Sequence, residues 1–248
     1  MKLIKNICYI CCSLLILSPA IAKPTTEIKK PIKHFSGDVH FGMLINTGNS
    51  KNKNIFGKLV LKYKRNNWQL EANTNGQLST SKEEKTAQNF SLAGTANYYF
   101  KPRHSAFTKL DYTYNQFSPY LCVYSLIVGY GWKAIDKEKI QLMFKVGPGF
   151  RHQKEATSEK TNTDPIGYAS GELVWKITKN ATFKQLFSAE GGKHNVYNYS
   201  KTALSTKIIG NLGVEISFIV KHNTDIPKLS KNKYKTDAST NVLLVYSF

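Results

Sequence analysis

Cysteine is scarce in this 248-residue sequence, and its distribution argues against disulfides. Cys8, Cys11 and Cys12 lie close to the N-terminus, and the rest of the sequence contains only Cys122. If the N-terminal segment is removed, no internal disulfide can form, and stability must come from other interactions. Beyond residue 22 the sequence also lacks a run of the ~20 apolar residues that a membrane-spanning helix needs, which excludes helical spans from that part.

Acidic residues are few as well, with 16 against 35 basic ones, which gives a formal net charge of +19. This surplus favours anionic partners such as lipopolysaccharide phosphates, nucleic acid or anionic solutes. The alternative is a lysine-rich composition that places lysines on every solvated face without selecting a ligand. Because no nucleic-acid recognition motif accompanies the basic residues, we do not expect nucleic acid as a partner.

The first 22 residues have the order of a secretory signal. Lys2 and Lys5 precede the apolar stretch 7–17, and Ala20 and Ala22 then fit the small-residue cleavage pattern. The apolar stretch is about half as long as a membrane-spanning helix, and no small residue precedes Cys11 or Cys12 as a lipid-anchored cysteine would require. We therefore expect a signal peptide over 1–22, a periplasmic tail over 23–34 and a single barrel domain over 35–248.

Apolar and polar residues alternate with a period of two through most of the remaining chain. From Trp68 to Leu78 the apolar and small residues occupy one face, and Gln69, Glu71 and their alternating successors occupy the other. This period is typical of strands with two different environments. Most of the predicted strands have the ~9–11 residues that a tilted strand needs to cross a membrane. They are predicted over 39–45, 55–63, 68–78, 90–100, 106–114, 124–132, 142–150, 169–177, 183–191, 202–208, 212–220 and 240–248.

The connections between these strands alternate between short turns and longer polar loops, as in outer-membrane barrels. We predict long loops over 46–53, 79–88, 152–166, 192–199 and 222–235, whereas the short connection 117–120 departs from the alternation. Trp68, Trp132 and Trp175 all fall beside short turns, as an interfacial aromatic girdle requires. The sequence therefore predicts an all-β fold, a transmembrane antiparallel up-and-down β-barrel of about twelve strands in the outer membrane.

The last strand ends on an aromatic residue. Val242, Leu244, Tyr246 and Phe248 share one face. We interpret these four residues as the signal by which the barrel-assembly machinery recognises the chain during biogenesis. If this strand closes against the first one, we expect Tyr246 and Leu244 to lie nearest Asp38 and His40.

Several short segments resemble the YdiY-like, salt-induced outer-membrane protein family. They are spread from about Phe35 to Phe248 and comprise Asn46-Thr-Gly-Asn-Ser-Lys51, Phe117-Ser-Pro-Tyr120, Gly129-Tyr-Gly-Trp132, Gly147-Pro-Gly-Phe-Arg151, Thr236-Asp-Ala-Ser-Thr240 and Val245-Tyr-Ser-Phe248. The resemblance implies a whole-chain barrel in the outer membrane. The family has no agreed ligand or reaction, so the resemblance supplies no catalytic residues, and fold alone does not supply a function.

Catalytic and metal-binding patterns are weak in the sequence. Among the histidines only His40 falls within a predicted strand, facing inward with Asp38, and Ser239 is expected toward the opposite rim. A serine nucleophile would have to lie within hydrogen-bond reach of such a base. No spacing typical of a zinc site occurs. We therefore expect no enzyme activity, no cofactor and no metal, with an outer-membrane hydrolase as a disfavoured alternative.

The inward faces carry charges of both signs, with nine bases and five acids. Either carboxylates tie the lysines into a salt-bridged plug, or a narrow water-filled passage has a positive field that favours anions. We expect a monomeric envelope protein that forms a narrow, weakly anion-preferring channel for small anionic solutes. The alternative is a structural or lipopolysaccharide-binding barrel without a pore. The predicted lumenal charges are Lys58, Lys62, Glu71, Lys109, Asp111, Lys145, Arg151, Glu172, Lys176, Lys184, Glu190, Lys207, Glu215 and Lys221.

Overall fold

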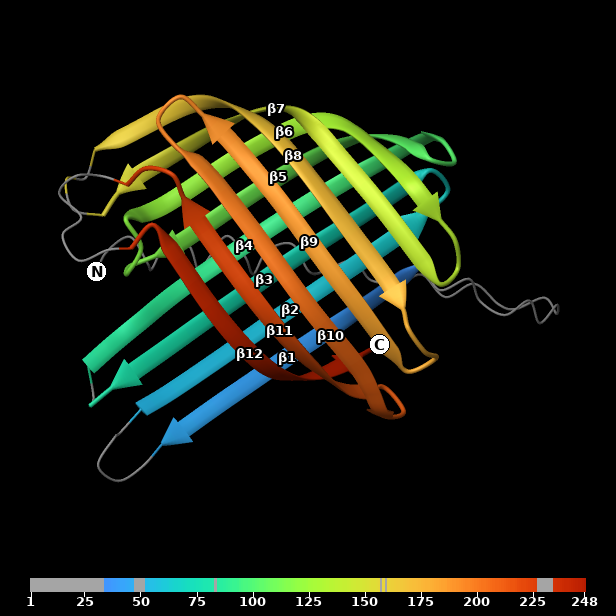
Figure 1. Cartoon of the computed structure of the whole chain (residues 1–248), viewed down its shortest axis with the longest axis horizontal. Helices are drawn as coiled ribbons and strands as arrows, with labels where there is room; N and C mark the ends of the chain where they lie inside the picture. The colour runs from blue at the N-terminus through green and yellow to red at the C-terminus, as the bar shows by residue number, and fades with distance from the viewer. Residues whose placement is uncertain (1–33, 47–51, 83, 157, 159, 227–233) are drawn as a thin grey trace, which may run out of the picture. The chain divides into compact units, whose positions relative to one another are not determined.

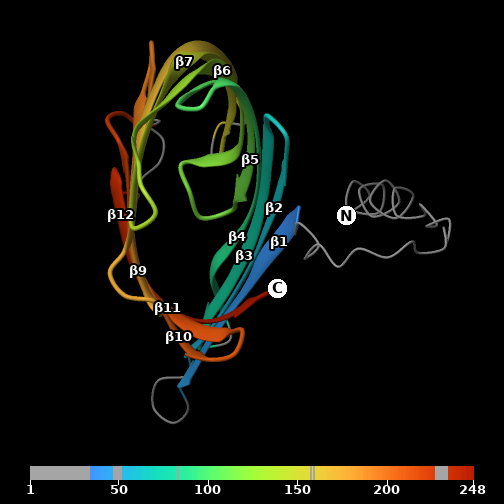
Figure 2. The ribbon, with the colours of Figure 1, turned by 90° about the vertical axis from the view of Figure 1, so that its right-hand side faces the viewer.

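The computed structural model describes residues 34–46, 52–82, 84–156, 158, 160–226 and 234–248. Within them the chain forms a closed antiparallel barrel in which each strand pairs with its neighbours in sequence and β12 pairs with β1 (Figures 1 and 2). The predicted all-β barrel is thereby confirmed. Its strands are β1 (Phe35–Asn46), β2 (Asn52–Arg65), β3 (Trp68–Ser81), β4 (Glu84–Lys101), β5 (His104–Asn115), β6 (Tyr120–Asp136), β7 (Ile140–Glu155), β8 (Thr161–Lys176), β9 (Ala181–Gly192), β10 (Val196–Ile209), β11 (Leu212–Asn223) and β12 (Thr236–Ser247).

The predicted signal peptide 1–22, with Ala20 and Ala22, and residues 23–33 of the predicted tail lie outside the described residues. His34 is described and lies against β2, where Lys64 donates its backbone N–H to the His34 carbonyl at 2.8 Å. Among the described residues, no helix is long and apolar enough to cross a membrane.

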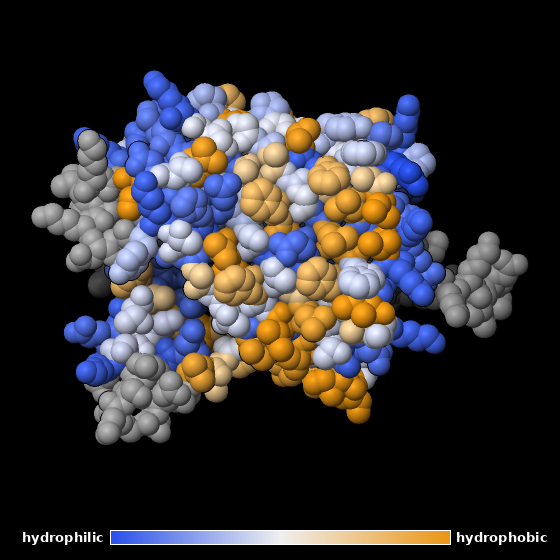
Figure 3. Space-filling model, in the orientation of Figure 1, coloured by the Kyte–Doolittle hydropathy of each residue, from blue (hydrophilic) through white to orange (hydrophobic). Residues whose placement is uncertain are grey.

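Apolar side chains cover the outer face of the barrel. On β6 and β7 the exposed side chains include Leu126, Val128, Val146 and Phe150, which alternate with inward-facing residues. On the face seen in Figure 3, apolar residues lie mostly across the middle and hydrophilic ones mostly at the two ends. An outward apolar band flanked by polar rims is the surface that a membrane-spanning barrel presents to lipid.

The aromatic residues expected in a girdle lie beside the short turns. Trp68 and Tyr98, on paired strands, have ring centroids 5.0 Å apart, and the centroids of Trp132 and Phe144 are 6.2 Å apart. Trp175 is exposed near the end of β8. Such rings are favoured at the boundary between lipid and water. The rim with the short connections after β2, β4, β6, β8 and β10 is called the turn rim below, and the opposite one the loop rim.

Three of the predicted long loops are shorter in the structure because their strands continue. β3 and β4 run to Ser81 and from Glu84, so most of the predicted loop 79–88 is a hairpin, which Lys82 helps to turn with a φ of 48°. β8 begins at Thr161 and β10 at Val196, which likewise shortens the predicted loops 152–166 and 192–199. The residues at these strand ends are polar because the strands extend beyond the apolar band. A prediction based on hydropathy therefore assigns them to loops.

The short connection after β5 is held in place by hydrogen bonds. The Asn115 side chain accepts the backbone N–H of Phe117 at 3.0 Å, and the carbonyl of the buried Pro119 accepts the N–H of Ala156 at 2.9 Å. These bonds anchor a connection on the loop rim to the end of β7. A long loop is not needed here because the turn closes locally and packs against its neighbour.

The closing pair, β1 with β12, is paired over a short length. Its register runs from Asp38 opposite Ser247 to Phe41 opposite Leu244, and Gly37 and Phe248 add hydrogen bonds at one end. By contrast, β1 pairs with β2 along its whole length. Ser247, rather than Tyr246, therefore lies opposite Asp38, and Val245, rather than Leu244, lies opposite His40. The expected neighbours are wrong by one residue. Directly opposed residues of an antiparallel pair point to the same face of the sheet, so the inward-facing Asp38 cannot lie opposite the outward-facing Tyr246.

Candidate functional site: the barrel lumen

The predicted lumenal charges lie at strand positions that alternate with the lipid-facing ones, but they differ in exposure. Arg151, Glu190 and Glu215 are buried, whereas Glu172, Lys176 and Lys207 are exposed. In register, Lys62 lies opposite Glu71, and Lys221 lies opposite Asp237. Lys109 pairs with Asp111 two residues along β5, and the Nζ of Lys145 lies 5.2 Å from the centroid of the Phe107 ring.

Arg151 is the centre of a buried network toward the loop rim. Its side chain is 2% exposed and donates to the backbone carbonyls of Glu190 at 3.3 Å and Asn195 at 2.8 Å. The Arg151 guanidinium also lies 3.9 Å from the Glu190 carboxylate. Beyond it, the Asn195 side chain donates to Asn223 at 2.7 Å. These bonds tie the connection between β9 and β10 to β7 on one side and β11 on the other.

A second network surrounds Glu215. Its carboxylate accepts hydrogen bonds from Lys201 at 2.8 Å and Ser205 at 3.3 Å. His40 Nδ1 lies 4.0 Å from the same carboxylate and has no hydrogen-bond partner among the described residues. Lys201 was missed in the sequence because its strand was predicted to start at 202. Extending the inward series of Ser205 and Ala203 back by two residues would have found it.

The wall formed by β3 and β4 is lined mainly by uncharged polar side chains. Gln77 donates to Asn54 at 3.4 Å and accepts from Asn89 at 3.1 Å, so three strands are linked by amides. Nearby, Tyr99 donates to Gln69 at 3.3 Å. The lumen therefore has a mainly uncharged part along β3 and β4, whereas the neighbouring β2 carries the inward-facing Lys58 and Lys62. The alternation of the sequence is enough to predict that these amides face inward, although the predicted lumenal residues include only charged ones.

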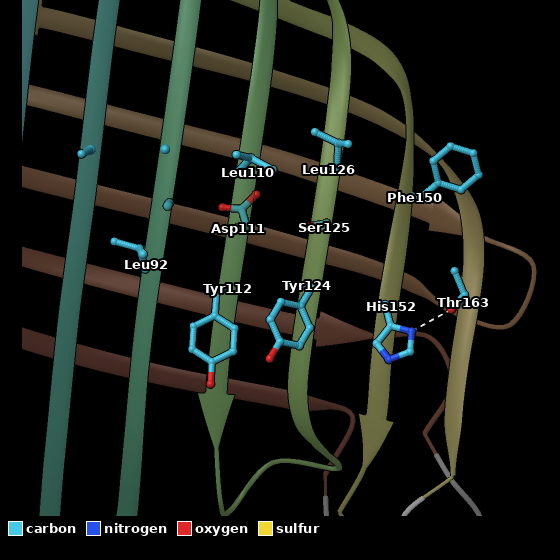
Figure 4. A pocket seen from close by; sticks show the side chains of 13 residues that line it. Leu92, Leu110, Asp111, Tyr112, Tyr124, Ser125, Leu126, Phe150, His152 and Thr163 are labelled. Carbon is cyan, nitrogen blue, oxygen red and sulfur yellow. Dashed lines mark hydrogen bonds between the residues drawn. The ribbon is translucent and has the colours of Figure 1, made fainter. Parts of the chain in front are cut away.

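An apolar groove of about 590 Å³ lies on the outer face, over β3 to β8. The small residues Ala72 and Gly94 are among its lining residues, and a Cβ added to Gly94 would meet nothing within 4 Å. Figure 4 shows Leu110, Leu126 and Phe150 further along the strands and Tyr112, Tyr124 and His152 nearer the connecting loops. His152 Nδ1 hydrogen-bonds with the Thr163 hydroxyl at 2.7 Å. The groove combines an apolar length with polar groups toward the loop rim.

The described residues contain no group of three or more His, Cys, Asp or Glu side chains that could hold a metal ion. In the same part of the chain, no hydroxyl is hydrogen-bonded to Nδ1 of His40, and its nearest charged partner is the Glu215 carboxylate. In a Ser-His-acid triad this nitrogen is held by a hydrogen bond to the acid, and at 4.0 Å no such bond is formed between Nδ1 and Glu215.

Comparison with known protein sequences gives two consistent matches. A family model described as "Protein of unknown function, DUF481" matches residues 39–248. The uncharacterized protein YdiY of Escherichia coli (strain K12) is 27% identical over 221 residues, covering 88% of this chain and 84% of YdiY. These matches confirm the resemblance found in the sequence.

Two solved structures share the fold. The NanC porin has a TM-score of 0.52 at 11% identity, over 85% of this chain and 98% of the porin. The COG4313 outer membrane channel from Pseudomonas putida F1 has a TM-score of 0.51 at 10% identity, over 92% of this chain and 100% of the channel. The barrel therefore has the fold of bacterial outer-membrane porins and channels.

Proposed function

We propose a channel function for this chain, which belongs to the DUF481 family. In this proposal it is an outer-membrane barrel whose lumen forms a narrow, weakly anion-preferring channel. The observation that carries the proposal is unbalanced positive charge. Among the described residues, Lys58 and Lys184 form no ion pair, although both occupy inward positions. A positive field between low-dielectric walls concentrates anions and repels cations.

The strand number supports a narrow passage. Barrels of about 8 strands are filled by their own side chains and those of about 16 leave an aqueous channel, so twelve strands lie between these cases. Arg151 and its partners occupy part of the lumen toward the loop rim, which further restricts the size of a solute. The porin and channel with the same fold support transport rather than catalysis, and we propose a monomer without enzyme activity or cofactor.

In this proposal the turn rim faces the periplasm and the loop rim faces the outside. The chain is exported by a signal peptide over 1–22, and the barrel-assembly machinery recognises Val242, Leu244, Tyr246 and Phe248.

Single-channel recording of the refolded full-length protein in a planar bilayer tests the proposal. We expect small, discrete conductance steps, and the same preparation unfolded by boiling should give none. A folded native barrel without discrete conductance would contradict the channel. Release of fatty acid from phospholipid by the native preparation would contradict the absence of enzyme activity.

The outer groove favours a second candidate, a barrel that holds an outer-leaflet lipid such as lipopolysaccharide. Its apolar lining suits an acyl chain, and Tyr112, Tyr124 and His152 lie toward the loop rim, where they could contact a polar headgroup. Gly94→Phe should fill the groove and lower the lipopolysaccharide retained per purified barrel. Gly167→Phe is the matched control, because Gly167 is exposed on β8, where an added Cβ also meets nothing. Equal retention by both variants would contradict a lipid site in the groove.

A further inference from the structure

We infer that Lys58, Lys184 and Ser217 converge, beside the Lys201–Glu215 ion pair, on a discrete binding site for a small oxyanion within the lumen. The ligand class is a carboxylate or a phosphate. The inference deepens the proposed channel function and rests on it, since a solute must enter the lumen to reach the site.

The register brings these residues together from distant parts of the chain. Lys184 on β9 and Ser217 on β11 both lie opposite Ala203 on β10, so the three form one row across the wall. Ala203 is 1% exposed and has a short side chain. The space above it is therefore open to the side chains of Lys184 and Ser217. Lys58 lies on β2, opposite His40 on β1, and so belongs to the other side of the seam between β1 and β12. Its charge is close enough to interact with those of Lys201, Glu215 and Lys184.

A buried hydroxyl in this cluster lacks a hydrogen-bond acceptor. Ser217 is 2% exposed, and its hydroxyl has no hydrogen-bond partner among the described residues. Buried polar groups are nearly always paired, so an unpaired one calls for a specific explanation such as an absent ligand or water. The Glu215 carboxylate accepts hydrogen bonds from Lys201 and Ser205, but the Ser217 hydroxyl does not donate to it.

Charge points to the same ligand. Lys58, Lys184 and Lys201 place three positive charges near the carboxylate of Glu215. The other carboxylate that acts on Lys58, that of Glu71, has the smaller effect and lies opposite Lys62. Like charges in a partly desolvated site repel each other, and a bound anion relieves this repulsion. Ammonium groups act as mobile point charges that suit carboxylate and phosphate oxygens. A carboxylate or phosphate is favoured over a halide, because its several oxygens can accept from the Ser217 hydroxyl and from the ammonium groups of different strands at the same time.

Isothermal titration of the refolded full-length barrel in detergent tests the site, with sodium acetate and sodium phosphate as probes and sodium chloride as the reference. All titrations use the same ionic strength. We expect saturable binding of at least one oxyanion. Lys58→Gln and Lys184→Gln should each weaken it about tenfold or more, since a hydrogen bond to a charged group is lost. Lys62→Gln removes the same charge from β2 opposite Glu71 and should have little effect.

Ser217→Ala is a second, smaller change that keeps every charge and should also weaken binding. Heat-dependent gel mobility checks that each variant is folded. The site is overturned if the native barrel binds neither oxyanion saturably, if chloride binds as tightly, or if Lys62→Gln weakens binding as much as Lys58→Gln. Binding in detergent does not require conduction, so a barrel that binds without conducting contradicts only the channel. One that conducts without binding contradicts only the site.

Discussion

Gly37 and Phe248 exchange two backbone hydrogen bonds, with the Gly37 N–H donating at 3.1 Å and the Phe248 N–H at 2.9 Å. The Phe248 ring lies so close to Gly37 that a Cβ at this position would meet it at 2.4 Å. The final residue thus closes the barrel against the start of β1. Because the paired part of this seam is short, each of its contacts contributes a large share of the closure.

Removal of the Phe248 side chain should therefore block assembly. We expect Phe248→Ser to leave export intact but to prevent accumulation of the heat-modifiable barrel, because the proposed recognition aromatic and the seam contact are lost together. Phe150→Ser is the matched control, since Phe150 is an exposed aromatic on β7 far from the seam in sequence. If Phe248→Ser still gives a barrel that runs faster on gels until boiled, the assembly role is wrong.

The short pairing of the seam predicts selective cross-linking. In a Cys122→Ser background, Asp38→Cys with Ser247→Cys should form a disulfide readily, since the Ser247 hydroxyl already donates to Asp38 at 2.6 Å. Leu44→Cys with Asn241→Cys would be opposed if the register continued, but pairing stops at Phe41 and Leu244. We expect slow or no cross-linking there by gel mobility after mild oxidation. Equal rates for the two pairs would show that the seam is paired throughout.

Loss of the Arg151 guanidinium should destabilise the barrel strongly. Arg151→Met leaves the Glu190 carboxylate buried without its nearest cation, and breaking a buried pair in this way costs about 3–5 kcal/mol in the free energy of unfolding. Arg151→Met combined with Glu190→Gln should cost less, because no unpaired charge remains. Urea unfolding followed by tryptophan fluorescence measures both. A double variant less stable than Arg151→Met would contradict the pairing.

Export should remove the first 22 residues. Ala20 and Ala22 fit the small binding sites of signal peptidase, so N-terminal sequencing of the protein purified from the envelope should begin at Lys23. A protein that still begins at Met1 would contradict the signal peptide.

The sequence predicted the fold well because lipid and lumen impose a strict alternation on every strand. The three tryptophans beside short turns and the inward position of Glu215 follow from that period alone. Contacts between strands did not follow, since they depend on register. Ser247 opposite Asp38 shows that an error of one residue changes every neighbour across the seam.

Pairing also changes the meaning of individual charges. Lys109 is one of the nine lumenal bases predicted from the sequence, but in the structure it is paired with Asp111 on the same strand. Lys58 and Lys184 stand out only when their neighbours are known. An inventory of charges therefore predicts the sign of the lumenal field, whereas the binding site depends on which charges remain unpaired.

The central claim, anion preference of the lumen, is tested most directly by the reversal potential of the native protein in a salt gradient across a planar bilayer. We expect a reversal potential whose sign shows mild anion preference. Lys176→Glu, a change at an exposed lumenal position without an ion-pair partner among the described residues, should move the potential toward zero without unfolding the barrel. A native reversal potential that shows cation preference would contradict the account.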